Sequence, residues 1–425
     1  MNGVSPDEYI ADPGLAEPGD RRIRYSERSM PLLTALTHRF RADRPFDGMT
    51  VAACLHVTAE TAVLARLLRA GGARVGLAAS NPLSTQDDIA AALAATEGIS
   101  VFARAGVDRK TYYEHIALAL GPDGPDLVID DGGDLLNILH TERADVLARV
   151  RGGCEGTTTG VLRLRRMAAE GALAFPMVAA SDTPVKRLVD NTYGTGQSVI
   201  DGLLRASGML LAGKTVVLAG FGSCGVGIAE CARSLGARVM ITEVDPVRAV
   251  DAVLRGFRVL TLAEAAPLGE VFITATGTAE VITAEHMAVM RDGAVLANAG
   301  HFDVEIDVRA LETLAVSVQP EVRPHTDAYE LADGRRLLLL AEGRVVNLVA
   351  AEGHPPEVMD VAFGIEALAL AWLAENAGKL SPDVHPVPAD IDAEAARLVL
   401  AALGAEIDSL TPAQRAYLAS WRFGS

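Results

Sequence analysis

Apolar runs of strand length alternate with stretches of helical periodicity along the first third of the chain. The expected strands are Val51–Leu55, Arg74–Ala79, Ile99–Arg104 and Asp126–Ile129. The expected helices are Ser26–Ala42, Ala59–Ala70, Thr85–Ala95 and Thr111–Leu120. Strands and helices that alternate at this spacing predict βαβ units, which build a parallel sheet.

A second alternating region begins near Lys214. Its expected strands are Thr215–Ala219, Arg238–Thr242, Phe257–Thr261, Val271–Thr276, Gly293–Asn298 and Leu337–Ala341. Helices are expected over 225–236, Val358–Asn376, Ile391–Leu403 and Pro412–Ser420. We therefore expect an α/β fold with two Rossmann-like, doubly wound domains. One domain, residues 192–350, is inserted between two pieces of the other, residues 1–185 and 354–385, and a short C-terminal segment follows over 386–425.

Polar side chains follow the expected strands of the first region. They are His56 and Thr58, Asn81 and Ser84, and Asp130 and Asp131. Ligands of parallel sheets bind beyond the carboxyl ends of the strands, so these residues are candidates for a site. The alternative is that they only cap the next helix, which is at least as good an account of Ser84. It suits His56 and the Asp130–Asp131 pair less well, because His is a poor cap and adjacent acids repel.

A glycine-rich turn in the second region has the context of a dinucleotide-binding fingerprint. Gly220, Gly222 and Gly225 follow a strand and open a helix, and Glu243 ends the next strand, 21 positions after Gly222. The glycines permit a tight turn, close approach of a pyrophosphate and close helix packing. Glu243 would accept ribose hydroxyls and repel a 2′-phosphate, which favours NAD over NADP. A turn that binds nothing is the alternative, and the nearby Arg248 weakens the choice of cofactor.

Composition narrows the classes of function. The 425 residues are 50% hydrophobic and 4% aromatic, with a net charge of −17. This acidic balance argues against nucleic acid or an anionic membrane as a partner. The four cysteines form no CxxC pair, and no cluster has metal spacing, so we expect neither a metal nor a disulfide framework. The start MNGVSPDEYI predicts no signal peptide, and no apolar run is long enough to span a membrane, so we expect a cytoplasmic protein.

A lysine and an aspartate lie between the two regions at a spacing that suggests acid–base chemistry. Lys186 and Asp190 are four residues apart and would share one face of a helix. Such pairs are common and weak on surfaces. Beside a nicotinamide cation, however, the pKa of a lysine would fall below its usual value of about 10.4, so that it could take a proton from a hydroxyl. His56, His301 and His354 offer further acid–base groups.

Many segments of the chain, in the same order, resemble one enzyme family. They are LHVTAET (55–61), NPLSTQDD (81–88), DDGGDLLNILH (130–140), TTTG (157–160), VKRLVDNTYGTGQS (185–198), GFGSCG (220–225), TEVDP (242–246), NAGHFDVEID (298–307) and AEGRVVNL with GHP (341–355). This pattern resembles S-adenosylhomocysteine hydrolase, also called adenosylhomocysteinase. NTYGTGQS, GHPPEVMD and the short C-terminus are similar to the archaeal and thermophile-like branch.

The resemblance implies reversible, NAD-dependent hydrolysis of S-adenosyl-L-homocysteine or a related purine nucleoside thioether such as S-inosylhomocysteine. The ribose 3′-hydroxyl is oxidised, the acidified 4′-proton is removed, and the thiolate leaves. Water then adds, and the ketone is reduced back. The implied partner is a small nucleoside, and the implied assembly is a homotetramer or homodimer with 386–425 as its oligomerisation segment.

The resemblance also assigns roles to residues. The implied catalytic residues are His56, Asp131, Lys186, Asp190 and His301. The implied substrate-binding residues are Thr58, Glu60, Ser181 and His354. The implied cofactor-binding residues are Thr157, Thr158, Thr159, Asn191, Gly220, Gly222, Gly225, Glu243, Arg248, Thr276 and Asn347.

Two positions depart from the family pattern. The family usually has a second Glu directly before TTTG, where it contacts the ribose hydroxyls, but Gly156 stands here after Glu155. Ser181 replaces the usual Asn. Loss of a hydrogen bond to a charged group costs about 1.5–3 kcal/mol. The space that the shorter side chains leave beside the ribose could admit an altered sugar or substituent, as in a divergent paralog. Alternatively, water or Glu155 could fill that space.

Two alternatives come from other classes. A non-catalytic NAD-binding regulatory protein would share the fold, although the presence of Lys186, Asp190, His56 and His301 speaks against it. A 2-hydroxy-acid dehydrogenase would share the two-domain layout, but it does not predict the DDGGD or TTTG segments.

Overall fold

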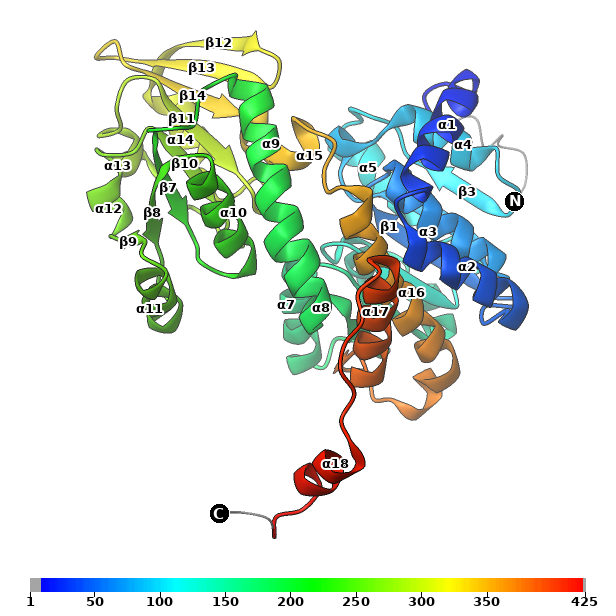
Figure 1. Cartoon of the computed structure of the whole chain (residues 1–425). Helices are drawn as coiled ribbons and strands as arrows, with labels where there is room; N and C mark the ends of the chain where they lie inside the picture. The colour runs from blue at the N-terminus through cyan, green and yellow to red at the C-terminus, as the bar shows by residue number, and fades with distance from the viewer. Residues whose placement is uncertain (1–8, 423–425) are drawn as a thin grey trace.

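The computed structural model describes residues 9–422, which fold around two β-sheets that lie side by side (Figure 1). Residues 1–8 and 423–425 lie outside the described residues, so the expectation about a signal peptide falls largely outside them. Each sheet carries helices on both faces. The expected α/β fold with two Rossmann-like sheets is confirmed.

The first sheet has seven strands in the order β15-β6-β5-β4-β1-β2-β3, and every pair of neighbours is parallel. Its strands are β1 (Thr50–Leu55), β2 (Arg74–Ala79), β3 (Ile99–Phe102), β4 (Leu127–Asp130), β5 (Gly152–Glu155), β6 (Met177–Ala179) and β15 (Val384–Pro386). The helices around it are α1 (Ala16–Glu27), α2 (Pro31–Asp43), α3 (Ala59–Ala70), α4 (Asp87–Ala94), α5 (Arg109–Ala119), α6 (Asp134–Thr141), α7 (Thr158–Ala169), α16 (Pro356–Asn376) and α17 (Ala389–Ala402).

The second sheet has eight strands in the order β12-β13-β14-β11-β10-β7-β8-β9. Its strands are β7 (Thr215–Ala219), β8 (Arg238–Thr242), β9 (Arg258–Val259), β10 (Val271–Thr274), β11 (Ala294–Asn298), β12 (Ala315–Arg323), β13 (Thr326–Leu331) and β14 (Arg336–Leu340). The pairs β12–β13 and β13–β14 are antiparallel, and all other neighbours in this sheet are parallel. The helices of this half are α9 (Thr195–Ser207), α10 (Ser223–Ser234), α11 (Pro246–Leu254), α12 (Leu262–Ala265), α13 (Ala284–Met287), α14 (Val308–Leu314) and α15 (Val346–Val349).

The chain crosses between the two sheets twice. The first crossing is a continuous helical rod made of α8 (Pro184–Lys186), a π-helical stretch (Arg187–Gly194) and α9, which is the long green helix in the middle of Figure 1. The second crossing follows α15 and leads into α16. The first sheet is built from two separate parts of the chain, because β15, which follows the second sheet in the sequence, pairs with β6, which precedes it. The chain therefore has to leave the first sheet and return to it.

Several elements were not expected from the sequence, among them β6, β15, α6, α7, α9 and α11, and three further differences have a clear physical reason. Residues 26–42 do not form one helix, because Pro31 has no N–H to continue α1 and instead begins α2. The strand β5 was not expected, since Gly-Gly-Cys-Glu has neither alternation nor β-branched residues, although all four residues are buried. The hairpin β12–β13 was also missed, and most of β12 is exposed.

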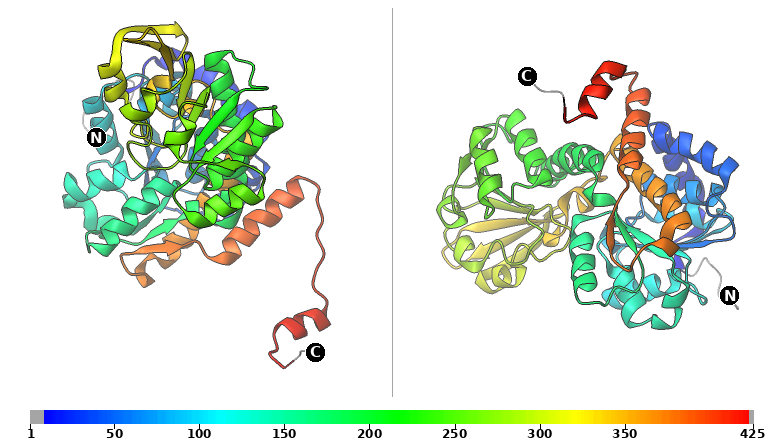
Figure 2. Two further views of the ribbon diagram at one scale, coloured as in Figure 1. Left: turned by 90° about the vertical axis from the view of Figure 1, so that its left-hand side faces the viewer. Right: turned by 90° about the horizontal axis from the view of Figure 1, so that it is seen from below.

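The C-terminal part consists of two helices with different surroundings. The helix α17 packs on α2, α8 and α16. The last helix, α18 (Pro412–Leu418), buries none of its residues and lies away from both halves (Figure 2). Among residues 9–422, no helix is both long and apolar enough to cross a bilayer.

Candidate active site

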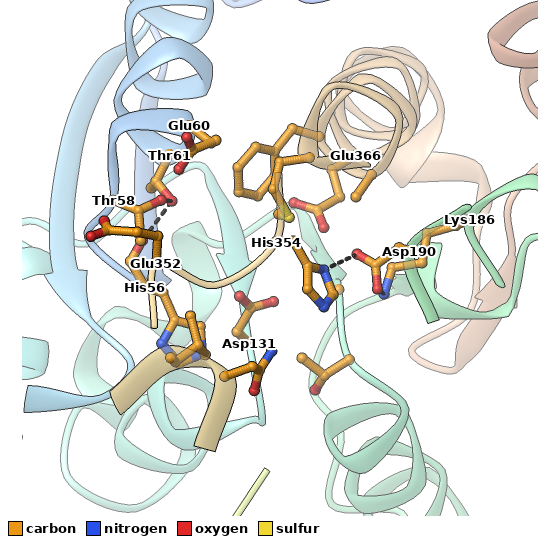
Figure 3. Close-up of a pocket in the computed structure, with 17 residues that line it drawn as sticks. His56, Thr58, Glu60, Thr61, Asp131, Lys186, Asp190, Glu352, His354 and Glu366 are labelled. Atoms are coloured by element: carbon orange, nitrogen blue, oxygen red, sulfur yellow. Dashed lines mark hydrogen bonds and ion pairs between the residues drawn. The ribbon is translucent and has the colours of Figure 1, made fainter. Parts of the chain in front are cut away.

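A cavity lies where the carboxyl edge of the first sheet faces the two crossings (Figure 3). Its walls come from the ends of β1, β4 and β5, from the helical rod, from α15 and from one face of α16. Its lining residues are His56, Thr58, Glu60, Thr61, Asp131, Gly156, Thr157, Lys186, Asp190, Asn347, Leu348, Glu352, His354, Met359, Ala362, Phe363 and Glu366. Most of the residues expected from the sequence to act on a substrate thus meet in one place.

Strand order explains why His56, Asp131 and Gly156 meet. They follow β1, β4 and β5, which are neighbours in the sheet. The amide of Asp131 donates to Cys54 O at 3.0 Å, and the amide of Gly156 donates to Asp130 O at 3.1 Å. The ladder therefore continues past the strand ends and fixes the backbone below the cavity.

The two acids that end β4 and β5 are buried and serve the backbone. Asp130 Oδ2 accepts a hydrogen bond from Leu136 N at 3.0 Å. Glu155 Oε1 accepts from Gly132 N at 3.0 Å and from Thr157 N and Oγ1 at 2.9 and 2.7 Å. Burial raises the pKa of both carboxyl groups well above the usual value. The side chain of Glu155 thus binds Gly132 and Thr157 and does not take the place of a side chain at Gly156.

Lys186 and Asp190 form a buried ion pair, with 3.2 Å between Nζ and Oδ1. Asp190 Oδ2 also lies 3.7 Å from His354 Nδ1, and His354 Nε2 lies 3.3 Å from Thr195 Oγ1. Burial acts to raise the pKa of Asp190, but Lys186 and His354 outweigh it, so the pKa falls well below its usual value. Asp190 is therefore ionised at neutral pH.

The pKa of Lys186 is raised in the protein alone, and the lowering expected from the sequence applies to the state with a nicotinamide cation beside it. Burial acts to lower it, but the carboxylates of Asp190, Glu366 and Asp131 outweigh that effect and raise the pKa above 10.5. In the protein alone, Lys186 is an ammonium group that can donate hydrogen bonds but not accept a proton. A lower value requires a further positive charge nearby, such as the ring of NAD⁺.

The π-helical stretch links this ion pair to the nucleotide half. Lys186 Nζ also lies 3.4 Å from Asn191 Oδ1, and Asn191 Nδ2 donates to Cys224 Sγ at 3.4 Å. Cys224 lies in the first turn of α10, directly after the glycine-rich turn. Asn191 thus connects the lysine to the segment expected to bind a cofactor.

His56 and His301 come together from different halves of the molecule. Their ring centroids lie 6.1 Å apart, and His56 Nδ1 lies 2.7 Å from Ser84 Oγ. Burial lowers the pKa of His301 to about 4. Burial, together with His301 and His354, lowers the pKa of His56 to about 3. Both rings are neutral at physiological pH and are able to accept one hydrogen bond and donate another.

Asp131 has the pKa of a group that exchanges protons near neutral pH. Burial raises its pKa from 3.8 to about 7, with Lys186 opposing and Asp190 adding to the shift. Its side chain points into the cavity, as does that of Glu366 (Figure 3). A carboxyl group with such a pKa is suited to act as a base or an acid.

The expected substrate-binding residues occupy different positions. Thr58 and Glu60 line the cavity, and Glu60 Oε1 accepts from Ser26 Oγ at 2.8 Å. Ser181 is fully buried, lies outside the lining, and has its Oγ 3.1 Å from Thr158 Oγ1. Ser181, expected to bind substrate, is thus not among the residues that line the cavity, and neither is Thr158.

The glycine-rich turn has the shape needed for a phosphate. A Cβ on Gly220 would lie 2.6 Å from Ala275 O, and one on Gly225 would lie 2.1 Å from Gly220 O, so neither position accepts a side chain. At Gly222 the nearest atom would be Arg248 Nη1, at 3.5 Å. The middle glycine thus faces open space at the start of α10, where backbone amides attract anions.

Glu243 lies beside this turn at the end of β8. Its Oε2 accepts from Phe221 N at 2.6 Å, and its Oε1 accepts from Val244 N and Asp245 N at 2.7 and 3.0 Å. These bonds fix the carboxylate where a dinucleotide fold places the ribose hydroxyls. The turn and the acid fit NAD.

The other expected cofactor residues lie on three different elements. Thr157 caps α7, with Thr158 and Thr159 in its first turn. Thr276 is held after β10 by Glu305, whose Oε2 accepts from its Oγ1 at 2.7 Å. Asn347 lines the cavity and donates to Ser198 Oγ at 3.0 Å, whereas its buried Oδ1 has no partner in the described part of the chain. That oxygen is available to accept a hydrogen bond from a ligand.

Sequence reasoning missed the contribution of α16. Met359, Ala362, Phe363 and Glu366 follow one another at helical spacing and line one wall of the cavity. A signal was present in Glu366, which is a lone acid within the apolar run FGIEALALAWL. An acid in a fully buried helix needs a partner or a function.

Comparisons with known proteins place these observations in one family. The model of S-adenosyl-L-homocysteine hydrolase matches residues 7–146, and the model of its NAD binding domain matches residues 191–353. The chain is 52% identical over 416 residues to the adenosylhomocysteinase of Aquifex aeolicus, covering 98% of this chain and 99% of that protein. It is 54% identical over 413 residues to that of Aeropyrum pernix, covering 97% and 99%. Over 427 residues it is 49% identical to that of a Nostoc species, with both chains fully covered. The chain belongs to the S-adenosyl-L-homocysteine hydrolase family and carries that family's NAD-binding domain.

Proposed function

We propose that the protein is an NAD-dependent adenosylhomocysteinase, which reversibly hydrolyses S-adenosyl-L-homocysteine to adenosine and homocysteine. The observation that carries the proposal is the buried group of Lys186, Asp190 and Asp131 in a cavity between the substrate half and the NAD half. This arrangement offers a cation, an ionised carboxylate and a carboxyl group with a pKa of about 7 to one sugar ring. Such a set suits stepwise proton transfers on a diol.

The residues of the NAD half are proposed to hold the cofactor. The turn at Gly220, Gly222 and Gly225 binds the pyrophosphate, Glu243 the ribose hydroxyls, and Asn191 and Asn347 the end that faces the cavity. Arg248, Thr276 and the threonines 157–159 complete the site. When bound, NAD supplies the acceptor for the hydride of the 3′-carbon and returns it at the end of the cycle.

We assign the first proton transfer to Lys186. Asp190 keeps the ammonium group of Lys186 close to the 3′-hydroxyl through their ion pair. Lys186 takes the proton of the 3′-hydroxyl once nearby positive charge has lowered its pKa. The same ammonium later returns that proton when the ketone is reduced.

We assign the second proton transfer to Asp131. The 3′-ketone acidifies the 4′-hydrogen, and Asp131, with its pKa of about 7, accepts that proton. The C5′–S bond breaks, the thiolate leaves as homocysteine, and water adds to the double bond. The neutral rings of His56 and His301 hold the water and supply the leaving group with a proton through it. Thr58, Glu60 and His354 orient the rest of the nucleoside.

The test is direct. Purified protein loaded with NAD is given S-adenosyl-L-homocysteine, and the released thiol and adenosine are measured together with the absorbance of NADH. We expect equal amounts of thiol and adenosine and a transient rise in NADH. If neither product nor NADH forms with this thioether or its inosine counterpart, the proposal is wrong, and a non-catalytic NAD-binding protein becomes the better account.

The same assay decides between substrates. Turnover restricted to S-inosylhomocysteine or to a modified nucleoside would identify a paralog. The geometry favours an ordinary ribose, because the space beside Gly156 is taken up by Asp131 and Glu366 and is not open for an added substituent.

We also propose a homotetramer or homodimer in the cytoplasm. Leu403, Ile407, Leu410, Leu418 and Trp421 expose large apolar side chains around α18, which is typical of a surface that a second copy covers. All four cysteines are free, as in a reducing compartment. Light scattering on the full chain tests the assembly, and a mass of one chain at micromolar concentration contradicts it. Cell fractionation tests the location.

A further inference from the structure

Glu366 is a buried acid that the proposed reaction sequence does not use. It lies in the middle of α16, between apolar sequence neighbours, and is 2% exposed. Its Oε2 has no hydrogen-bond partner in the described part of the chain. Burying an unpartnered carboxylate oxygen is unfavourable unless a ligand supplies the partner. Its side chain points into the cavity, on the same side as Asp131 and Lys186 (Figure 3).

The carboxylate of Glu366 lies next to the position where the family pattern is broken. A Cβ on Gly156 would lie 2.6 Å from Glu366 Oε1 and 2.5 Å from Asp131 Oδ1. The glutamate that the family usually has at position 156 contacts the ribose hydroxyls. Here its space is taken by a carboxylate that comes from another element. Neither water nor Glu155 is needed to fill the gap.

We propose that Glu366 is a substrate-binding residue that accepts a hydrogen bond from the ribose 2′-hydroxyl, in place of the carboxylate missing at position 156. The inference rests on the proposed function, because it assumes that a ribose lies in this cavity. Lys186 and Asp190 hold the 3′-hydroxyl from the helical rod, and Glu366 approaches the adjoining hydroxyl from α16. A side chain at position 156 would have to displace the carboxyl groups of Glu366 and Asp131, which glycine leaves in place.

The experiment compares Glu366→Leu with wild type, both loaded with NAD, using adenosine and 2′-deoxyadenosine as probes. Binding is measured by calorimetry, and NADH formation is followed separately. We expect the dissociation constant for adenosine to rise about tenfold in the variant, because the 2′-hydroxyl is left without its hydrogen-bond acceptor in a buried site. The constant for 2′-deoxyadenosine should change less than threefold. Glu357→Leu, at an exposed acid on the same helix, is the matched control and should bind both nucleosides as wild type does.

A second pair of variants distinguishes loss of the ribose contact from misfolding, because one variant is expected to restore the binding that the other loses. Gly156→Glu alone should bind adenosine poorly, because its side chain would meet Glu366 and Asp131. Adding Glu366→Ala to Gly156→Glu should restore most of the binding by moving the carboxylate back to position 156. Equal losses for both nucleosides in Glu366→Leu, or a Gly156→Glu variant as good as wild type, overturn the proposal.

The two proposals can fail separately. A protein that hydrolyses the thioether but binds adenosine and 2′-deoxyadenosine equally well has the proposed function without the proposed role of Glu366. A protein that forms no NADH but loses its preference for adenosine in Glu366→Leu has the ribose contact without the reaction.

Discussion

At the scale of single residues, one lysine among several acids sets the electrostatics of the site. Lys186 faces Asp190 directly, with Asp131 and Glu366 close enough to raise its pKa. Three carboxyl groups share one cation, so they cannot all stay ionised without penalty. Burial and mutual repulsion therefore push protons onto the weaker acids, Asp131 and Glu366.

Replacing Lys186 should separate cofactor binding from oxidation. The change Lys186→Ala removes the proposed proton acceptor but leaves the glycine-rich turn intact. We expect NAD to stay bound and NADH formation with adenosine to fall at least about a hundredfold. Lys110→Ala is the control, because Lys110 pairs with Glu114 at the same spacing on the surface. An unchanged rise of NADH absorbance in Lys186→Ala would refute the role.

Asp131 should link stability to pH. Its folded pKa of about 7 is raised, so the protonated form favours folding. That contribution is complete below the unfolded pKa of about 3.9 and is lost as pH rises through about 7. Since Asn does not ionise, Asp131→Asn should raise the melting temperature by a few degrees at about pH 8, and by less at about pH 5. Thermal unfolding at both values measures this. Equal shifts at both would argue against a raised pKa.

At the scale of elements, the sequence indicated most helices and strands but missed those decided by tertiary packing. Alternation predicted β1, β2, β7, β8 and the long α16 close to their observed bounds. The single helix expected over 26–42 was wrong, because the apolar periodicity was followed across Pro31, a residue that begins a helix more readily than it continues one. Gly152–Glu155 forms a strand because β4 and β6 pair with it on both sides, a context that four residues do not reveal.

One buried aspartate joins two of these helices. Asp360, on α16, accepts from Leu32 N and Leu33 N at 2.9 and 2.8 Å, and so caps α2 from a distant part of the chain. Asp360→Ala should lower the free energy of unfolding by about 1–3 kcal/mol, because two buried amides lose their partner. Urea unfolding measures the loss. A change below about 0.5 kcal/mol would mean that another group caps these amides.

Glu243 should matter for the nucleotide half alone. Glu243→Ala removes the acceptor of Phe221 N next to the glycine-rich turn. We expect NAD to be lost on desalting, with at least a tenfold weaker affinity, while adenosine affinity measured at saturating NAD changes little. Glu264→Ala is the control, because Glu264 accepts from Thr261 N in the same half, away from the turn. Retention of NAD in Glu243→Ala would contradict the assignment.

At the scale of the whole molecule, the site is a product of topology. His56, Asp131, Lys186, His301 and His354 are spread over some 300 positions, and strand ends and crossings bring them together. His56 and Asp131 could be predicted from the sequence, because ligands of parallel sheets bind beyond the carboxyl ends of the strands. The same argument could not predict Glu366, since it does not show which face of α16 meets the sheet edge.

The π-helical stretch between Lys186 and α9 has a consequence for how this chain tolerates change. Its wider turns carry one more residue than an α-helix of the same length would need. Deleting a single position here would remove that surplus residue, and the rod could continue as an α-helix with α9 close to its present orientation. A deletion within the ordinary turns of α9 would instead rotate everything beyond it by about 100°. The nucleotide half would then turn away from the sugar although neither half had unfolded.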